Sequence, residues 1–355
     1  MRVLLTADPE IPVPPAGYGG IERIVDALVC HFRAEGHTVG LVAHGGSQSP
    51  TDALFPWRNR CSRGAWGALG NALALRCAVQ AFNPEVLHSF SRLGYLLPVM
   101  RSTLPKIMSY QRHTGGAQIR WAARLAGGTL CFTGCSEFIC RMGRPCGGEW
   151  HAVPNFVRAD RISFTAHVPP DAPLLFLSRV ESIKGPHLAI EIAKRSKRRL
   201  VIAGNRAQGG AERQYWDREI APHLGRDGIE YVGEVDDTKK NGLLGRAAAL
   251  VVPVQWDEPF GIVFAEALAA GTPIITCARG ALQEIVRPGI TGFFVRSVED
   301  GVEAVGRLST IDRAACRRDA EHRFSVGVCA AQYLRLYSEI LSAATERSAR
   351  RGAAG

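Results

Sequence analysis

The sequence predicts an α/β protein built from two Rossmann-like domains, each a doubly wound parallel sheet. Short apolar runs alternate with helical patterns along the whole chain, which is typical of parallel strands joined by crossover helices. At 355 residues the chain is too long for one ordinary hydrophobic core. Its composition, 46% hydrophobic and 21% charged residues, is that of a globular protein.

The first half of the chain carries the apolar runs that we interpret as the strands of one sheet. They are Val3–Thr6, Val39–Ala43, Val86–Ser89, Lys106–Tyr110, Thr129–Thr133 and Trp150–Val153. Together they predict an N-terminal domain over residues 1–157.

The second half carries the runs that we interpret as a second sheet. They are Leu174–Leu177, Leu200–Ala203, Glu230–Val232, Leu250–Val252, Pro273–Thr276 and Gly292–Val295. They predict a C-terminal domain over 173–328. The polar residues 158–172, which include Pro169-Pro170, predict a linker. A last helix within 329–346 has its apolar side chains on one face, and we expect it to pack back on the first domain.

The net charge of +10 would suit a nucleic acid, an anionic lipid surface or phosphorylated substrates. No nucleic-acid motif accompanies the basic clusters, so we expect no nucleic-acid partner, whereas peripheral membrane contact stays open. No apolar run reaches the roughly 18–20 residues that span a bilayer. The chain opens on a strand rather than on a secretory signal, so we expect a cytoplasmic location.

Ten cysteines raise the question of a metal site or a disulfide framework. The four cysteines between positions 131 and 146 include no Cys-x-x-Cys pair and have no neighbouring histidine. The pairs Asp236-Asp237 and Asp257-Glu258 also lack further ligands at useful spacing. We therefore predict buried thiols, no metal site and no other cofactor.

The most informative stretch runs from Asp257 to Gly271 and contains two glutamates. Pro259 fits the first position of a helix, because it lacks the amide that would be left unbonded there. Gly271 fits the left-handed residue that ends the helix. Glu258 is then predicted just before the helix, and Glu266 two turns inside it.

The start of this helix also offers backbone donors. The amides of Phe260, Gly261 and Ile262 have no partner within the helix. A carboxylate beside free N–H groups suits a ligand that carries both hydroxyls and phosphate. A sugar nucleotide is such a ligand.

A loop of prolines and glycines, Pro12 to Glu22, joins the first strand to its helix. Gly17, Gly19 and Gly20 would let a ligand approach the backbone at the helix start, although the loop could also be only a stiffened connection. It is neither the Gly-x-Gly-x-x-Gly motif nor a Walker loop.

Basic and histidine side chains follow other strands. Arg179 and Lys184 come after the first strand of the second domain and could hold a diphosphate as it leaves, although cations in loops are ordinarily solvated. His88 and His113 follow strands of the first domain and could face a ligand, although a histidine at a strand end is as often a hydrogen-bonded structural residue as a base. Ligands bind doubly wound sheets at the carboxyl ends of the strands, so all these residues are expected to face one cleft.

Taken in order, these motifs resemble glycosyltransferase family 4, the retaining, nucleotide-sugar-dependent enzymes of GT-B fold. The resemblance covers nearly the whole chain and is strongest from Leu174 to Val295. It is carried by the Gly-Gly loop, the Arg179 and Lys184 pair, the two glutamates in their Glu-Pro-Phe-Gly setting, Ala-Gly-Thr-Pro273 and Gly289-Ile-Thr-Gly292. The fold implied is two Rossmann-like domains facing a central cleft, with the C-terminal helix crossing back to the first.

The resemblance also implies roles for residues around the donor phosphates. Gly19 and Gly20 would lie against the donor phosphates or sugar, near the acceptor. Arg179 and Lys184 would clamp the diphosphate, so that enzymes of this type need no divalent metal.

The remaining implied roles concern the sugar and the nucleoside. Glu258, with the amides of 260–262, would position the donor sugar and phosphate. Glu266 would accept hydrogen bonds from the ribose hydroxyls. Val232, Gly233 and Val235 would line the pocket for the base.

One position departs from the family pattern. Many members place a histidine after the fourth strand of the first domain, where this chain has Gln111, with His113 two residues later. Glutamine can donate or accept a hydrogen bond but cannot act as a base at neutral pH. Either His113 substitutes for the usual histidine, or Gln111 only orients the sugar.

The sequence thus predicts transfer of a hexose from a nucleoside-diphosphate sugar to an acceptor hydroxyl, with retained anomeric configuration. UDP-sugar is the first choice of donor and GDP-mannose the second, while the acceptor, a sugar, lipid-linked or natural-product hydroxyl, stays unknown. The main alternative is an inactive sugar-nucleotide-binding protein of the same fold. A phosphorylase-like enzyme with pyridoxal phosphate and a nicotinamide dehydrogenase are weaker alternatives.

Overall fold

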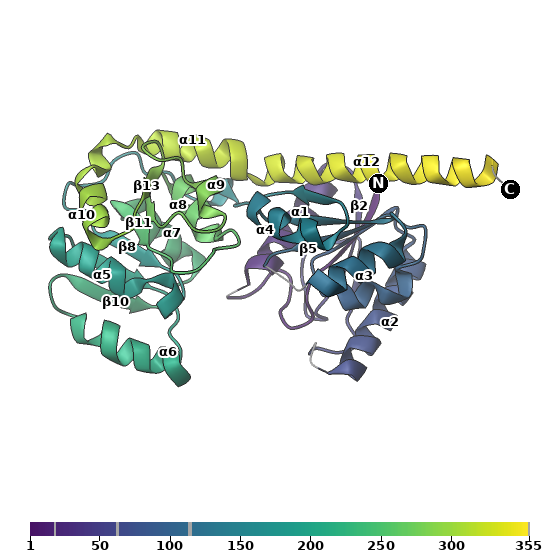
Figure 1. Cartoon of the computed structure of the whole chain (residues 1–355), viewed down its shortest axis with the longest axis horizontal. Coiled ribbons are helices and arrows are strands. Elements are labelled where there is room, and N and C mark those ends of the chain that lie inside the picture. The colour runs from purple at the N-terminus through teal and green to yellow at the C-terminus, as the bar shows by residue number, and fades with distance from the viewer. Residues whose placement is uncertain (18, 62–63, 113–115, 354–355) are drawn as a thin grey trace. The chain divides into compact units, whose positions relative to one another are not determined.

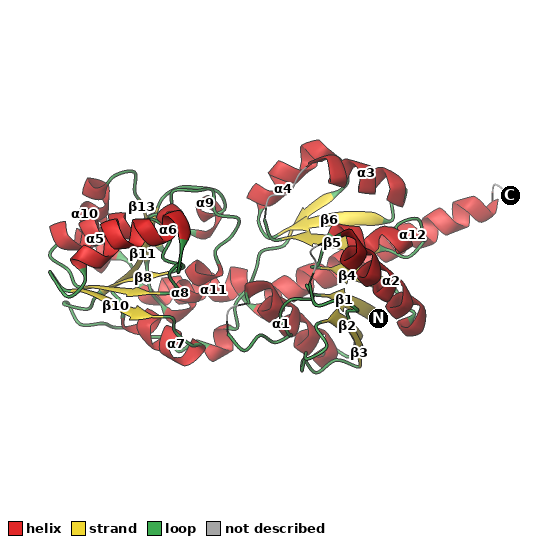
Figure 2. Cartoon of the chain, turned by 90° about the horizontal axis from the view of Figure 1, so that it is seen from below, coloured by secondary structure: helices red, strands yellow, loops and turns green. Residues whose placement is uncertain are grey.

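The computed structural model describes residues 1–17, 19–61, 64–112 and 116–353, which fall into two compact units (Figure 1). The first unit comprises Met1–Asn155 and Val326–Gly355, and the second comprises Phe156–Ser325. Within each unit, strands lie between helices (Figure 2). Both sheets are parallel throughout, which confirms the predicted α/β class.

The sheet of the first unit has seven strands in the order β3-β2-β1-β4-β5-β6-β7. The strands are β1 Arg2–Thr6, β2 Thr38–Ala43, β3 Ala53–Pro56, β4 Val86–Ser89, β5 Lys106–Tyr110, β6 Leu130–Gly134 and β7 Trp150–Ala152. The direction of strand addition reverses between β1 and β4, so the carboxyl ends of these two strands flank a switch point.

The helices of the first unit cover both faces of its sheet. They are α1 Gly20–Ala34, α2 Ala65–Phe82, η1 Leu93–Val99, α3 Gly116–Ala126, α4 Glu137–Gly143, η2 Arg144–Cys146 and α12 Val326–Ala353. In Figure 1, α12 runs along one side of this unit, whereas α2 and α3 lie on the other.

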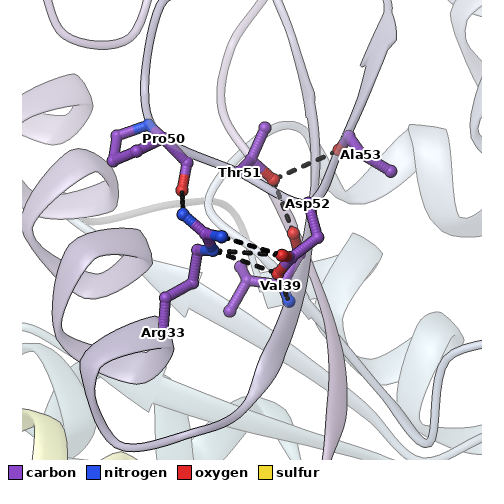
Figure 3. A network of polar contacts seen from close by, with 6 residues as sticks. All are labelled: Arg33, Val39, Pro50, Thr51, Asp52 and Ala53. Atoms are coloured by element: carbon purple, nitrogen blue, oxygen red, sulfur yellow. Dashed lines mark hydrogen bonds and ion pairs between the residues drawn. The ribbon is translucent and has the colours of Figure 1, made fainter.

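Strand β3 was missed in the sequence because it is short, ends in proline and follows β2 without an intervening helix. A polar network holds the connection in place (Figure 3). Both carboxylate oxygens of Asp52 accept from Arg33 Nε at 3.2 Å, and Oδ2 also accepts from the amide of Val39 at 2.8 Å. The amide of Val39, together with Arg33, lowers the pKa of Asp52. The loop is thereby tied to α1 and β2.

Helix α12 docks on the first unit through a buried aromatic cluster. Tyr333 and Tyr337 of α12 are fully buried, and Tyr337 packs against Phe32 of α1. The Tyr337 hydroxyl is 2.6 Å from Nδ1 of His88, whose Nε2 is 2.6 Å from Ser109 Oγ. His88 is therefore a core residue covered by α12, which confirms the structural alternative rather than a position facing a ligand.

The sheet of the second unit has six strands in the order β10-β9-β8-β11-β12-β13. The strands are β8 Leu174–Leu177, β9 Leu200–Ala203, β10 Ile229–Gly233, β11 Ala249–Val252, β12 Ile274–Thr276 and β13 Gly292–Phe294. Here the direction of strand addition reverses between β8 and β11, and these two strands pair directly with each other.

The helices of the second unit complete its layers. They are η3 Ala159–Arg161, η4 Ser182–Lys184, α5 Pro186–Arg195, α6 Gly210–Tyr215, η5 Trp216–Ile220, η6 Ala221–His223, α7 Asp237–Arg246, α8 Ile262–Ala270, α9 Leu282–Ile285, α10 Val298–Gly306, η7 Leu308–Thr310 and α11 Arg313–Phe324.

The segment 158–172, predicted as a linker, lies within the second unit. Arg317 of α11 donates to the carbonyl oxygens of Ala159 and Ile162, and Arg313 donates to that of Thr165. These bonds hold the backbone of the segment on α11, while most of its side chains are exposed, so its polar composition reflects contact with water rather than a flexible linker.

We expect Arg313→Met to lower the free energy of unfolding by at least about 3 kcal/mol. The guanidinium group of Arg313 also donates to the carbonyl oxygens of Ala247 and Gly245 and to Thr272 Oγ1, each at 2.9 Å, and all these acceptors would lose their partner. Urea unfolding measures the change. Arg318→Met, on an exposed residue of the same helix, should change stability by no more than about 0.5 kcal/mol. Equal effects of the two substitutions would contradict this interpretation.

Acid should destabilise the first unit through His88. Burial lowers the pKa of His88 to about 3, against 6.5 for an ordinary histidine. Between these values the unfolded chain binds a proton that the native state excludes, so stability falls with decreasing pH by up to about 1.4 kcal/mol per unit. Urea unfolding across this range should show a shallower slope for His88→Asn than for the unsubstituted chain. The exposed control His167→Asn should leave the slope unchanged.

Candidate functional site

The candidate site of the second unit lies at the carboxyl ends of β8 and β11, the two strands that flank its switch point. Lys184 follows β8, and Glu258 follows β11. Lys184 Nζ is 2.5 Å from Glu258 Oε2, and the two residues are only 8% and 7% exposed. The structure thus brings two of the predicted residues into a buried ion pair, although 74 positions separate them in sequence.

Trp256, which sequence reasoning did not single out, completes this pair. Its Nε1 donates to Glu258 Oε2 at 2.9 Å, and Lys184 Nζ lies 4.7 Å from the centre of its ring. The tryptophan thus supports both charges, one by a hydrogen bond and the other by a cation–π contact. Its position two residues before Glu258 was the only signal in the sequence.

The turn after Lys184 requires glycine. Gly185 has a φ of +74°, and a Cβ atom there would lie 2.2 Å from the carbonyl oxygen of Pro253. Pro186 then begins α5, a position that proline favours because its missing amide would be unbonded there. Close approach of the loops after β8 and β11 is therefore what allows Lys184 to reach Glu258.

The helix after Glu258 begins later than predicted. Helix α8 starts at Ile262, so Pro259 is not its first residue. Gly261, with a φ of +80°, is the residue before the helix, and a helix cannot continue through that left-handed conformation. Glu266 consequently lies about one turn inside α8 rather than two. Gly271 ends the helix with a φ of +85°, which confirms the prediction for that end.

The turn before α8 presents backbone donors. Among the residues that the structure describes, the amides of Phe260, Gly261 and Ile262 donate to no other protein group. The Phe260 side chain is buried and packs edge-on against Phe324, so only its backbone is available to a ligand. Gly280 packs closely against the backbone of this turn. A Cβ atom at Gly280 would lie 2.4 Å from the carbonyl oxygen of Glu258, so only glycine fits there.

Arg179 lies at the same edge of the sheet but is not part of the buried pair. Its Nη1 is 2.5 Å from Glu181 Oε1, and the side chain is 38% exposed. Each of the two predicted cations is therefore held by a carboxylate of its own, Arg179 by Glu181 and Lys184 by Glu258.

Glu266 has a partner that the sequence did not reveal. Lys240 of α7 donates to Glu266 Oε1 at 2.5 Å and forms a second ion pair with Asp237 at 3.0 Å. Burial alone would lower the pKa of Lys240, but the charges and hydrogen bonds of Glu266 and Asp237 raise it overall. Lys240 and Glu266 lie on different helices, so no local pattern links them.

The end of β10 forms another part of this edge. Val232, Gly233 and Val235 are all partly exposed there. Gly233 has a φ of +78°, and its carbonyl oxygen accepts from the amide of Gly204 at 2.8 Å. The strand pairing shifts register between Tyr231 and Gly233, which leaves partly exposed backbone after the strand.

In the first unit, Gly19 and Gly20 lie where β1 leads into α1, and α1 begins at Gly20. A Cβ on Gly19 would lie 2.7 Å from that of Pro15, so the loop has no room for a side chain at this position. Gln111 follows β5 and is partly exposed. His113 lies outside the described residues.

Asp8 is a further candidate that sequence reasoning did not single out. It follows β1 by two residues, and its Oδ1 is buried with no hydrogen-bond partner among the described residues. Burial, reinforced by the charge of Glu10, raises the pKa of Asp8 to about 6. An acidic residue just after a central strand was the available signal.

Two features are absent from the described residues. They contain no group of three or more His, Cys, Asp or Glu side chains placed to hold a metal ion. They also contain no helix with the length and hydropathy needed to cross a bilayer. None of the ten cysteines forms a disulfide bond within the described part of the chain. Cys61 and Cys77 are exposed, so the prediction of buried thiols holds only in part.

Two family models match consecutive parts of the chain. The model for Glycosyltransferase Family 4 matches residues 18–161, and the model for Glycosyl transferases group 1 matches residues 161–322. The second range contains the Lys184–Glu258 pair and all of α8.

Similar proteins and structures cover nearly the whole chain. Glycogen synthase of Mycobacterium tuberculosis is 29% identical over 90% of this chain and 88% of its own. AviGT4, a glycosyltransferase involved in Avilamycin A biosynthesis, has a TM-score of 0.71 and 24% identity over 96% of this chain and 98% of its own. HepE of Anabaena in complex with UDP and glucose has a TM-score of 0.69 and 18% identity, covering 96% of this chain and 100% of its own. The chain therefore belongs to glycosyltransferase family 4 and is a glycosyltransferase of GT-B fold.

Proposed function

We propose that this glycosyltransferase moves a hexose from a nucleoside-diphosphate sugar to an acceptor hydroxyl and retains the anomeric configuration. The observation that carries the proposal is the buried Lys184–Glu258 pair beside the unpartnered amides that precede α8. A UDP-sugar is the first choice of donor and GDP-mannose the second. The solved complex of HepE with UDP and glucose supports the first choice by analogy.

The diphosphate end of the donor would lie between Lys184 and these amides. An ammonium group has three N–H donors, and Glu258 accepts from Lys184 in the structure, which leaves capacity for phosphate oxygens. The amides add neutral donors at the start of α8, where the helix dipole favours negative charge. Arg179 would supply a second cation from the same edge of the sheet.

Glu258 has two tasks in this proposal. Its carboxylate holds Lys184 in place, with Trp256 sharing the same oxygen, and it hydrogen-bonds hydroxyls of the donor sugar. Glu266 would bind the ribose hydroxyls, with Lys240 orienting its carboxylate. Val232, Gly233 and Val235 would contact the base mainly through backbone, which is why the residue types do not select one base.

The reaction would proceed on one face of the sugar. The bond from the anomeric carbon to the diphosphate oxygen breaks, and the acceptor oxygen bonds to that carbon on the same face, so the configuration is retained. The departing phosphate oxygen takes the acceptor's proton, and no protein nucleophile is required. Most of the acceleration would come from stabilising the charge that develops on the diphosphate. Because Lys184, Arg179 and the amides supply that stabilisation, we propose that no divalent metal is needed.

An inactive sugar-nucleotide-binding protein is the second candidate, and Gln111 favours it, since a histidine is common at that position in the family. A thermal-shift panel of nucleoside diphosphates and their sugars would identify the donor in either case, because a ligand that binds only the native state raises apparent stability. Release of UDP from UDP-glucose, with or without added acceptors, would separate the two candidates. Binding without any release would favour the inactive protein.

Lys184→Ala and Glu258→Ala should each reduce the rate of donor turnover at least about a hundredfold. The first removes the charge that stabilises the leaving diphosphate, and the second releases Lys184 from its position. The rate of UDP release measures both. Because the two residues act as one unit, the double variant should be little slower than either single variant.

Lys194→Ala is the matched control, since Lys194 also pairs with a glutamate, Glu191, but at 30% exposure on α5. Its turnover should equal that of the unsubstituted chain. Normal turnover in Lys184→Ala and Glu258→Ala would overturn the proposed site.

Gly280→Ala should weaken nucleoside-diphosphate binding at least about tenfold, because the new methyl group would displace the backbone of Glu258. Gly289→Ala provides the control. Both glycines have positive φ, at +57° and +76°, so both substitutions strain the backbone, but a Cβ at Gly289 meets nothing within 4 Å. Isothermal titration with UDP should show unchanged affinity for Gly289→Ala. Equal losses of affinity would show that strain alone, and not the Glu258 turn, is responsible.

A further inference from the structure

Helix α2 exposes an apolar face that no other element of the described structure covers. Trp66, Leu69 and Leu73 lie at helical spacing and are 86%, 49% and 41% exposed. The opposite face packs on the unit through residues such as Leu75 and Phe82. A helix at the surface of a protein ordinarily turns charged side chains to solvent, and α2 has one charged residue in its 18. This face therefore calls for a physical explanation.

The surrounding sequence is strongly basic. Residues 53–136 contain ten lysines and arginines and a single acidic residue, Glu85. The carboxylate of Glu85 accepts from the amide of Arg2 at 2.7 Å, at the amino end of β1. The chain as a whole has 43 basic and 33 acidic residues, so the charge asymmetry is a property of this segment.

Several of these arginines are exposed. Along the sequence they lie close to aromatic or aliphatic residues that are also exposed. Arg58 and Arg60 precede α2, and Arg76 lies on its exposed face. On α3, Arg120 and Arg124 flank Trp121, which is 53% exposed. Within the part of the chain that the structure describes, none of these arginines forms an ion pair with a carboxylate. Their charges are thus available to an external partner.

We propose that the outer face of α2, with the basic residues around it, docks on a membrane surface that contains anionic phospholipid. Tryptophan and leucine would enter the boundary between headgroups and acyl chains, where an indole ring is favourably placed. Arginines near anionic headgroups add electrostatic attraction to this burial. The attachment is peripheral, as expected of an amphipathic surface helix.

The charge distribution favours this occupant over a second copy of the chain. A symmetric dimer through α2 would bring two basic surfaces together, and like charges at an interface oppose association. Nucleic acid would satisfy the arginines but leave the apolar stripe exposed to water. An anionic bilayer satisfies both features at once.

Co-sedimentation of the full chain with vesicles tests the proposal. Vesicles of phosphatidylcholine and phosphatidylglycerol should bind the chain, and vesicles of phosphatidylcholine alone should bind it at least about tenfold less. Raising the salt concentration should weaken binding. Equal binding to the two kinds of vesicle, or none to either, would overturn the proposal.

Substitutions locate the surface. Trp66→Ser combined with Leu69→Ser should lower the vesicle partition coefficient at least about tenfold. Ile290→Ser, at a position of the second unit that is 51% exposed, should leave it unchanged. Arg120→Glu with Arg124→Glu should also weaken binding, whereas Arg218→Glu with Arg226→Glu removes the same net charge from the second unit and should have little effect.

Two further measurements keep the result interpretable. The melting temperature of every variant should match that of the unsubstituted chain, and a variant that does not is replaced by a milder one, alanine in place of serine or glutamine in place of glutamate. Sedimentation velocity in the absence of lipid should show a monomer. A dimer that Trp66→Ser dissociates would assign the face to a second copy and overturn the proposal.

Discussion

The ion pair between Lys184 and Glu258 is the constraint on which the candidate site depends. Two charges out of water are costly unless each is well partnered, and removing one partner leaves an uncompensated charge. Here one carboxylate oxygen accepts from both Lys184 and Trp256, so the charges are satisfied within a small volume. The loops after β8 and β11 must approach closely for this contact, and Gly185 and Gly280 permit that approach.

The same arrangement explains why the turn before α8 remains irregular. A helix that began at Pro259 would bond the amide of Ile262 to the carbonyl oxygen of Glu258. Gly261 instead turns the chain in a left-handed conformation, and the backbone donors stay beside the ion pair. A charged group and neutral donors are then fixed before any ligand arrives, which lowers the reorganisation needed during a reaction.

Much of the fold could be predicted because the apolar runs of buried parallel strands are local signals. Strands β4, β5, β8 and β9 begin and end where the sequence indicated. The start of α8 could not be predicted, because Pro259 fits a helix start locally and the Gly280 contact that fixes the turn is distant in sequence. The 158–172 segment was misread for a similar reason, since its arginine partners lie on α11.

The residues of the candidate site were likewise predictable from the sequence only in part. The motif predicted Lys184 and Glu258 because their types and spacing carry chemical meaning, whereas Trp256, Lys240 and Asp8 matter through contacts or burial that no spacing encodes. His88 shows the same limit. Its position after a strand fitted either a ligand contact or a structural hydrogen bond, and only the three-dimensional packing of α12 identifies it as a core residue.

The two ends of the chain share one unit, and this has a consequence for biosynthesis. A ribosome releases Phe156–Ser325 in one continuous piece, so the second unit can fold as soon as it emerges. The first unit must wait for α12, which follows the whole second unit in the chain, before the ring of His88 is shielded from water. Until α12 is made, the nascent protein therefore carries an unfinished hydrophobic core, and chaperones would have their longest access to that half.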